Sequence, residues 1–177
     1  MSLEDLRQTI PDYAKDLRLN LNTVLNQPEL TERQLWGTAL ACAHAVGNID
    51  TLTTIAEEAR GHLDETAFQA AQSAAAVMGM NNIYYRFLHL ASNDEYGTMR
   101  AGLRMNVIRT HGSDPVDFEL WCLAVSAING CGACVDSHEK VVREKGLGAD
   151  QVLAAVRIAS TIHAVARVLD AETALAE

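Results

Sequence analysis

The sequence predicts an all-α fold, and three observations support this prediction: the composition, the capping signals and a resemblance between two segments of the chain. The 177 residues are rich in Ala, Leu and Glu, include three prolines, and show no segment of strand-like alternation. Hydrophobic residues make up 49% of the chain, which is typical of a protein that buries a core. We therefore expect one helical domain over residues 1–177.

Two helices are predicted in the first half by residues that favour helix N-termini. Thr31 and Gln34 have the spacing of a capping box, and the apolar segment LWGTALACAHAV follows them. Asp64 is a typical N-cap residue for a helix that runs toward Met80. These signals place two helices between residue 31 and about residue 80.

A third and a fourth helix are predicted in the second half. Asp114 provides an N-cap and Pro115 a first helical residue ahead of FELWCLAVSAI. The Asn129–Gly130 step is expected to break this helix, so that the next one begins near Cys131. Gly146 suits the C-terminal end of that helix, because glycine readily adopts the left-handed conformation found there.

A last helix is predicted from about Asp150 to Leu169. Its apolar residues recur at helical spacing and form one stripe. The stripe consists of Val152, Val156, Ala159, Ile162, Ala166 and Leu169. This pattern is typical of a helix that packs one face on a core.

Two parts of the chain resemble each other. QLWGTALACAHAVGNIDTL, from Gln34, is similar to ELWCLAVSAINGCGACVDS, from Glu119, and the alignment pairs Trp36 with Trp121. Further on, FQAAQSAAAVMG resembles VLAAVRIASTIH. We interpret this as a tandem duplication with halves over roughly 31–92 and 115–170. The alternative is that Ala-rich amphipathic helices resemble one another without a duplication.

The charge and the termini exclude several classes of function. The net charge is −9 and no Lys/Arg cluster is present, which argues against nucleic acid or an anionic membrane as a partner. No uninterrupted apolar run reaches the length of a membrane span, and the start MSLEDLRQTI lacks the apolar region of a signal peptide. We expect a cytoplasmic protein. No glycine-rich nucleotide motif is present, so we expect no bound nucleotide, flavin or other cofactor.

The chemistry is concentrated in the segment NGCGACVDSHEK. Cys131 and Cys134 have the spacing that allows a disulfide within the first turn of a helix, and a helix N-terminus favours the thiolate. His138 lies one turn after Cys134 on the same helix face, where an imidazole can accept the thiol proton. Glu119, at the start of the preceding helix, is the nearest acidic residue by sequence that could orient the imidazole.

Three hypotheses explain this segment. The first is a dithiol redox centre. The second is a zinc site with Cys131, Cys134 and His138 as ligands and Glu119 as a possible fourth, although structural zinc sites prefer Cys and His. The third is a pair of buried thiols beside a histidine with a satisfied hydrogen bond. In a reducing compartment a close cysteine pair is more often catalytic or metal-binding than structural. The helix start, the spacing and the lone histidine favour the first hypothesis, the dithiol redox centre.

Several other cysteine, histidine and aromatic residues could have a catalytic or binding role, but we interpret them as structural. Cys42 and Cys122 lie in apolar helix patterns without a thiol or histidine at redox spacing, so we expect two buried thiols. His44 would point away from Cys42. His163 is expected to be a core histidine with one hydrogen bond. Tyr84, Tyr85 and Phe87 are interpreted as core or subunit-interface residues.

The pattern E119-x11-C131-x2-C134-x3-H138, within SAINGC and after an LW pair, closely resembles the AhpD family of alkyl hydroperoxide reductases, within the carboxymuconolactone decarboxylase-like superfamily. The resemblance extends over nearly the whole chain. It includes, in order, LEDLRQTIPDYAKDLRLNL, QLWG, MGMNN and GLRMNVI.

The resemblance implies a duplicated all-helical fold, a homotrimer and a thiol-dependent antioxidant peroxidase. It implies that Cys134 is the reactive thiol, that Cys131 is its disulfide partner and proton donor, and that Glu119 and His138 relay protons to Cys134. Such proteins are thought to take electrons from dihydrolipoamide on a 2-oxoacid dehydrogenase component. That component works with lipoamide dehydrogenase, and the electrons pass to organic hydroperoxides and to a partner peroxiredoxin, AhpC.

The sequence departs from this family at one position beside the thiols. Well-known members carry a histidine just before the second cysteine, where this chain has Ala133. Any role of that histidine in tuning the thiolate or contacting a partner is therefore not transferred. Two other functions remain as alternatives: a non-redox enzyme similar to carboxymuconolactone decarboxylase, and a zinc-binding interaction protein.

Overall fold

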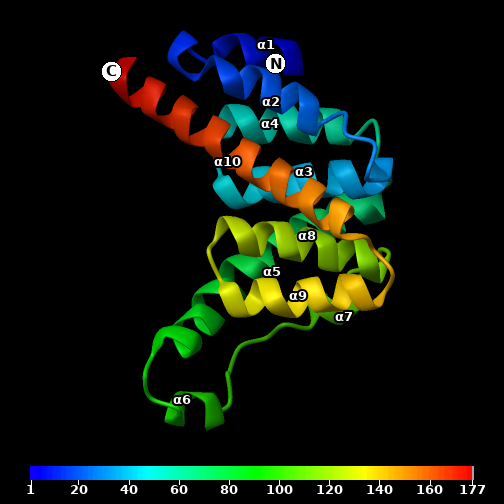
Figure 1. Cartoon of the computed structure of the whole chain (residues 1–177), viewed down its shortest axis with the longest axis vertical. Coiled ribbons are helices and arrows are strands. Elements are labelled where there is room, and N and C mark those ends of the chain that lie inside the picture. The colour runs from blue at the N-terminus through cyan, green and yellow to red at the C-terminus, as the bar shows by residue number, and fades with distance from the viewer. Residues whose placement is uncertain (177) are drawn as a thin grey trace.

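The computed structural model describes residues 1–176, and within them it contains helices and connections but no strand (Figure 1). The predicted all-α class is confirmed. In chain order the elements are α1 (Leu3–Thr9), the 3₁₀ helix η1 (Asp12–Ala14), α2 (Lys15–Val24), α3 (Glu32–Val46), α4 (Ile49–Ala59), α5 (Glu65–Leu90), α6 (Glu95–Thr98), α7 (Val107–Thr110), α8 (Pro115–Ile128), α9 (Gly132–Glu144) and α10 (Ala149–Ala176).

Two helices form the centre of the molecule. α3 and α8 pack on each other, and each also packs on α5 and on α10. α3 is buried without interruption from Gln34 to Ala43, and the stretch of α8 from Asp117 to Ser126 is buried except at Glu119. Helices that are buried on nearly all sides occupy the core of a protein. The partial exposure of Glu119 therefore marks the one place in this stretch where α8 faces a cavity.

The predicted capping signals operate as expected. Thr31 and Gln34 form a reciprocal capping box on α3, with the Thr31 hydroxyl accepting from the Gln34 N–H. Asp64 caps α5 by accepting from the Ala67 N–H. Asp114 caps α8, which begins at Pro115. These three helix starts could therefore be predicted from the sequence, because the capping side chains accept hydrogen bonds from backbone N–H groups that have no partner within the helix.

Two helices are longer than predicted. α5 continues past Met80 to Leu90, because no glycine or proline follows Gly79 until residue 97. α10 continues past Leu169 to Ala176 through the helix-favouring segment DAETALA. In the extended part of α5, Tyr85 and Phe87 are 38% and 49% exposed, so they do not belong to the core. The alternative, a place in a subunit interface, stays a prediction.

A segment that carries α6 and α7 connects α5 to α8, and its tip projects away from the rest of the molecule (Figure 1). The end of α5 and this segment carry seven of the thirteen large exposed apolar side chains in residues 1–176. They are Ile83, Tyr85, Phe87, Leu90, Tyr96, Met99 and Leu103. This concentration distinguishes the end of α5 and the projecting segment from the remaining surface.

The helix order agrees with the predicted internal duplication. The α3–α4–α5 series has lengths of 15, 11 and 26 residues, and the α8–α9–α10 series has lengths of 14, 13 and 28 residues. The halves over 31–92 and 115–170 remain a prediction about the origin of the chain. In both series the middle helix is the short one, and in the second it carries the cysteines.

α10 is long and apolar enough to span a membrane by length and composition alone. Half of its most apolar stretch is nevertheless buried, and the helix packs along α2, α3 and α8. Burial against protein is the behaviour of a core helix, and we interpret α10 in this way.

The contact between the two central helices depends on a glycine. A Cβ atom at Gly37 would lie 2.2 Å from Cε2 of Trp121, a side chain that is fully buried. We expect Gly37→Ala to lower the free energy of unfolding by about 3 kcal/mol, because the indole has no room to move. Gly79→Ala is the matched control, since no atom would lie within 4 Å of its Cβ, and it should stabilise α5 by up to about 1 kcal/mol. Chemical denaturation measures both, and equal effects would contradict the packing argument.

A buried carboxyl links the same two helices. The Asp117 carboxylate accepts a 3.0 Å hydrogen bond from Gln34 Nε2, and burial raises the pKa of Asp117. When burial raises the pKa of a carboxyl in the folded state, the protein loses stability as the pH rises from the unfolded-state pKa through the folded-state pKa, because the charged carboxylate is poorly solvated in the folded protein. We therefore expect Asp117→Asn, which keeps the acceptor oxygen, to raise Tm more at pH 7 than at pH 3. Asp16→Asn, at an exposed position in the first turn of α2, should show no such gain.

Candidate active site

The turn between α8 and α9 places the cysteines at a helix N-terminus. α8 ends at Ile128, and Gly130 adopts a φ of 66°, which is the left-handed conformation that the turn requires. Cys131 is the N-cap of α9, and its sulfur accepts a hydrogen bond of 3.3 Å from the Cys134 N–H. A disulfide joins Cys131 and Cys134, whose Cα atoms are 5.3 Å apart. The helix N-terminus therefore stabilises negative charge on Cys131 when the disulfide opens.

The two sulfurs differ in access. Cys131 is completely buried, whereas Cys134 is 6% exposed and lies on the wall of a cavity of about 400 Å³. A small substrate in the cavity reaches Cys134 first. This difference assigns the outer position to Cys134 and the inner position to Cys131.

An acid–imidazole pair lies beside Cys134. Nδ1 of His138, on α9, is 2.6 Å from Oε2 of Glu119, on α8, and both side chains are mostly buried. Nε2 of His138 lies 3.3 Å from the sulfur of Met78, on α5. Within residues 1–176 His138 makes no hydrogen bond to either cysteine sulfur in the disulfide state. The structure thus brings Glu119, Cys131, Cys134 and His138 together, with the imidazole turned toward α5.

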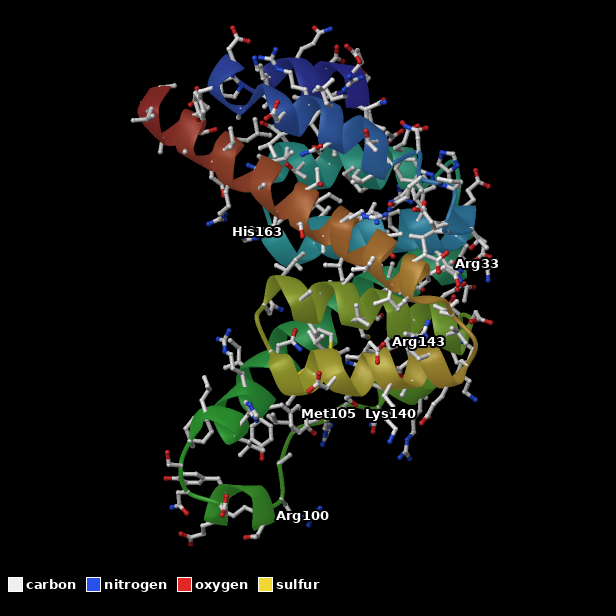
Figure 2. All side chains as sticks on the ribbon, in the orientation of Figure 1. Arg33, Arg100, Met105, Lys140, Arg143 and His163 are labelled. Carbon is white, nitrogen blue, oxygen red and sulfur yellow. A yellow bond between two sulfur atoms is a disulfide. The ribbon has the colours of Figure 1, made fainter. Side chains whose placement is uncertain are left out.

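The cavity is mainly apolar and is built from α5, α7, α8, α9 and the segment before α7. Its walls consist of Met78, Asn81, Tyr85, Met105, Ile108, Glu119, Ala133, Cys134, Ser137, His138 and Val141. Met105 lies beside α9 (Figure 2). A cavity with apolar walls and a few polar groups is typical of a small-molecule site.

Several of these wall residues were not predicted as site residues. Met78 and Asn81 belong to MGMNN, and Met105 and Ile108 belong to GLRMNVI. Both motifs contributed to the resemblance described above, but their side chains carry no chemistry that spacing reveals. The sequence offered one indication of these residues: MGMNN and GLRMNVI occur in the same chain as the CxxC segment. The fold brings all three segments to one cavity.

A buried polar network holds the turn that precedes Cys131. The Asn82 amide donates 2.9 Å to Ser126 Oγ and accepts 2.9 Å from the Asn129 amide. Arg86 donates to the Asn129 carbonyl, and the Cys131 N–H donates 3.1 Å to the Ser126 carbonyl. Asn82 and Ser126 are fully buried, so each hydrogen bond is costly to lose. This network ties α5 to the start of α9.

Comparison with known proteins places the chain in a family. A model of the carboxymuconolactone decarboxylase family matches residues 94–177. A protein of Solibacter usitatus named alkyl hydroperoxide reductase AhpD is 62% identical over 172 residues, which cover 97% of each chain. Proteins with the same name are 63% identical in Acidobacterium capsulatum, over 97% of this chain and 94% of that one, and 55% identical in Streptomyces griseus, over the full length of both. The chain belongs to the AhpD family.

The family predicted from the sequence motifs is thus confirmed, because these relatives are identical at more than half of the aligned positions over nearly the whole chain. Ala133, which lies between Gly132 and Cys134, lines the cavity beside Cys134. Its methyl group adds to the apolar wall and supplies no charge next to the sulfur.

The remaining cysteines are buried thiols, as predicted. Cys42 and Cys122 are free and fully buried, and desolvation raises the pKa of both. Such thiols are poor nucleophiles because the thiolate is disfavoured. His44 is half-buried beside Gln72, and desolvation lowers its pKa.

The prediction for His163 is wrong. The structure places it on the outer face of α10, exposed rather than in the core (Figure 2). Ala and Val neighbours made the stretch look buried on all sides, but α10 covers the core with one face only.

The side chains around the cysteines are not arranged as a zinc site. In the described chain no three His, Cys, Asp or Glu side chains are placed to hold a metal ion. The sulfurs of Cys131 and Cys134 bond to each other, and His138 is directed to Glu119 and Met78. The geometry around the cysteines is that of a disulfide beside an acid–imidazole pair.

Proposed function

We propose that this protein is a thiol-dependent alkyl hydroperoxide reductase whose redox centre is the Cys131–Cys134 dithiol. The observation that carries the proposal is that Cys134, linked to Cys131, lines an apolar cavity together with the Glu119–His138 pair. The names of its AhpD relatives support the same activity. The apolar walls suit the organic part of a hydroperoxide, so we propose organic hydroperoxides as substrates.

The proposed reaction begins with reduced cysteines. The Cys134 thiol transfers its proton to the Glu119–His138 pair, and the thiolate attacks the outer oxygen of the hydroperoxide. The O–O bond breaks, the alkoxide takes the proton from the pair and leaves as an alcohol, and Cys134 becomes a sulfenic acid. The Cys131 thiol then attacks the Cys134 sulfur, supplies the proton with which the hydroxyl leaves as water, and forms the disulfide. Two thiols and one hydroperoxide thus yield one disulfide, one alcohol and one water.

We propose a dithiol as the source of electrons. A donor thiolate attacks Cys134, the more accessible sulfur, and Cys131 leaves as a thiolate stabilised at the N-terminus of α9. The second donor thiol then releases Cys134. Dihydrolipoamide on a lipoyl-bearing dehydrogenase component, kept reduced by lipoamide dehydrogenase, fits this role because it is a small dithiol on a mobile arm. The peroxiredoxin AhpC is the proposed partner that receives electrons, and the cytoplasm is the proposed compartment.

The donor is tested by comparing two complete electron-transfer systems. NADH consumption is followed with lipoamide dehydrogenase, a lipoyl-bearing component and an organic hydroperoxide, with and without a peroxiredoxin. NADPH consumption with thioredoxin and its reductase is measured at matched protein concentrations. We expect the lipoyl system to be faster; a silent lipoyl system beside an active thioredoxin system would remove the adaptor role.

Thiol counting separates redox from non-redox functions. Treatment of the reduced protein with one equivalent of hydroperoxide should remove two free thiols without forming covalent dimers. A protein that loses no thiols would instead support the decarboxylase-like alternative.

We also propose that the protein forms a homotrimer. The exposed apolar side chains at the end of α5 and on the projecting segment, from Ile83 to Leu103, form a surface that a subunit interface would cover. Light scattering measures the mass directly. A stable species at the monomer mass of 19.2 kDa at micromolar concentration would contradict the proposal.

A further inference from the structure

Three polar side chains contact the sulfur of Met78, although a thioether is only a weak hydrogen-bond acceptor. The side chain is 1% exposed, and its sulfur lies 3.3 Å from His138 Nε2, 3.6 Å from Ser126 Oγ and 3.7 Å from Asn82 Nδ2. A thioether is a weak acceptor and has no hydrogen to donate. Each of the three neighbours must therefore supply the hydrogen in its contact with Met78.

This arrangement constrains the hydrogen on His138. In a common carboxylate–histidine pair the Nδ1 hydrogen points to the carboxylate, and Nε2 is left as a free base. Here Glu119 occupies the Nδ1 side at 2.6 Å, but Nε2 faces a sulfur that can only accept. The contact is favourable only when Nε2 carries a hydrogen.

We propose that Met78 is a positioning residue, whose sulfur holds the His138 ring with a hydrogen on Nε2 while Cys134 is in the disulfide. When the disulfide is reduced, this hydrogen is available to the Cys134 thiolate, which lies one turn away on α9 and lines the same cavity. The proton is shared between Nε2 and the Cys134 sulfur, and Met78 neither gains nor loses electrons. The inference rests on the proposed role of Cys134 as a redox thiol.

Few other groups compete for this hydrogen. The titratable side chains in the cavity beside His138 are Glu119 from α8, Tyr85 from α5 and Cys134 from α9. His111, before α8, stacks on Phe118, and burial lowers its pKa, with Glu119 and Asp114 acting in the opposite direction. Glu119 is directed to Nδ1, so in residues 1–176 Met78 is the hydrogen-bond partner of Nε2.

Two substitutions at this position separate positioning from packing. Met78→Leu keeps an apolar side chain of similar size but removes the acceptor. Met78→Gln keeps the length and offers a carbonyl oxygen to the same donors, at the cost of burying an amide. If Met78 only fills space, Leu is the better replacement; if it positions His138, Gln is better. Met80→Leu, on the same helix and without a hydrogen bond to its sulfur in the described chain, is the matched control.

The first readout is the rate at which dithiothreitol reduces the disulfide, measured beside Tm for each variant. We expect about a tenfold lower rate for Met78→Leu, a loss of about 1.4 kcal/mol in stabilisation of the Cys134 thiolate when the second dithiothreitol thiol releases it from the mixed disulfide. Met78→Gln should stay within about twofold of the wild type even if its Tm is lower, and Met80→Leu should be unchanged. Rates that follow Tm, with Leu at least as fast as Gln, would overturn the proposal.

The second readout is the ¹⁵N spectrum of the His138 imidazole in the disulfide form. We expect a hydrogen on Nε2 in the wild type and in Met78→Gln at neutral pH, and a smaller fraction of molecules with that hydrogen in Met78→Leu. An unprotonated Nε2 in the wild type at neutral pH would also overturn the proposal. Neither readout uses a hydroperoxide. A wild-type protein that reduces no hydroperoxide would thus contradict the proposed function alone, and these measurements would still decide the role of Met78.

Discussion

Replacement of Cys134 by serine is expected to abolish hydroperoxide reduction. Cys134 is the sulfur that lines the cavity, so its thiolate is the nucleophile that the proposed reaction needs, and a serine hydroxyl is not ionised at neutral pH. Replacement of Cys131 by serine should permit one attack on the hydroperoxide but block turnover, because no internal disulfide can form. The two variants therefore fail at different steps.

A steady-state assay with an organic hydroperoxide and a dithiol donor measures the overall loss. Mass spectrometry after a single addition of hydroperoxide should find a sulfenic acid or a mixed disulfide in Cys131→Ser and an unmodified residue 134 in Cys134→Ser. Cys42→Ala is the matched control, because this buried free thiol is disfavoured as a thiolate. A Cys134→Ser variant with undiminished activity would disprove the assignment.

Removal of either member of the acid–imidazole pair is expected to lower activity by about 100-fold or more, the usual scale of general acid–base catalysis. In Glu119→Gln the imidazole loses the carboxylate that lies 2.6 Å from Nδ1, and with it the charge that favours a proton on the ring. In His138→Gln the group that exchanges the proton with Cys134 is absent. Both changes should make the Cys134 thiolate less favourable.

The rate of Cys134 alkylation against pH reports this effect separately from turnover. We expect both curves to move to higher pH, because the thiolate then forms only when hydroxide is more abundant. Glu139→Gln is the control on the same helix, since the exposed Glu139 carboxylate pairs with Arg143 at 3.8 Å. Alkylation curves that match the wild type in both variants would remove Glu119 and His138 from the mechanism.

The helix starts and the CxxC turn could be predicted because they depend on short-range contacts. A capping residue satisfies backbone N–H groups within one turn, so Thr31, Asp64 and Asp114 identify their helices without reference to the rest of the chain. The end of α8 at Asn129–Gly130 could be predicted for a similar local reason, because glycine readily adopts the left-handed conformation that Gly130 has in the structure. The ends of α5 and α10 were placed too early because no residue there stops a helix.

Short sequence patterns were enough to predict the helical class, the helix starts, the family and the four residues that meet at the candidate site. Spacing along one helix and one turn brings Cys131, Cys134 and His138 close together. Three features could be seen only in the folded protein: Cys134 is the sulfur that faces the cavity, Glu119 contacts Nδ1 of His138, and Met78 faces Nε2. These contacts join the consecutive helices α8 and α9 to α5, which lies well before them in the chain. Their geometry depends on how the central helices pack, as at Gly37 and Trp121, and no local pattern encodes that packing.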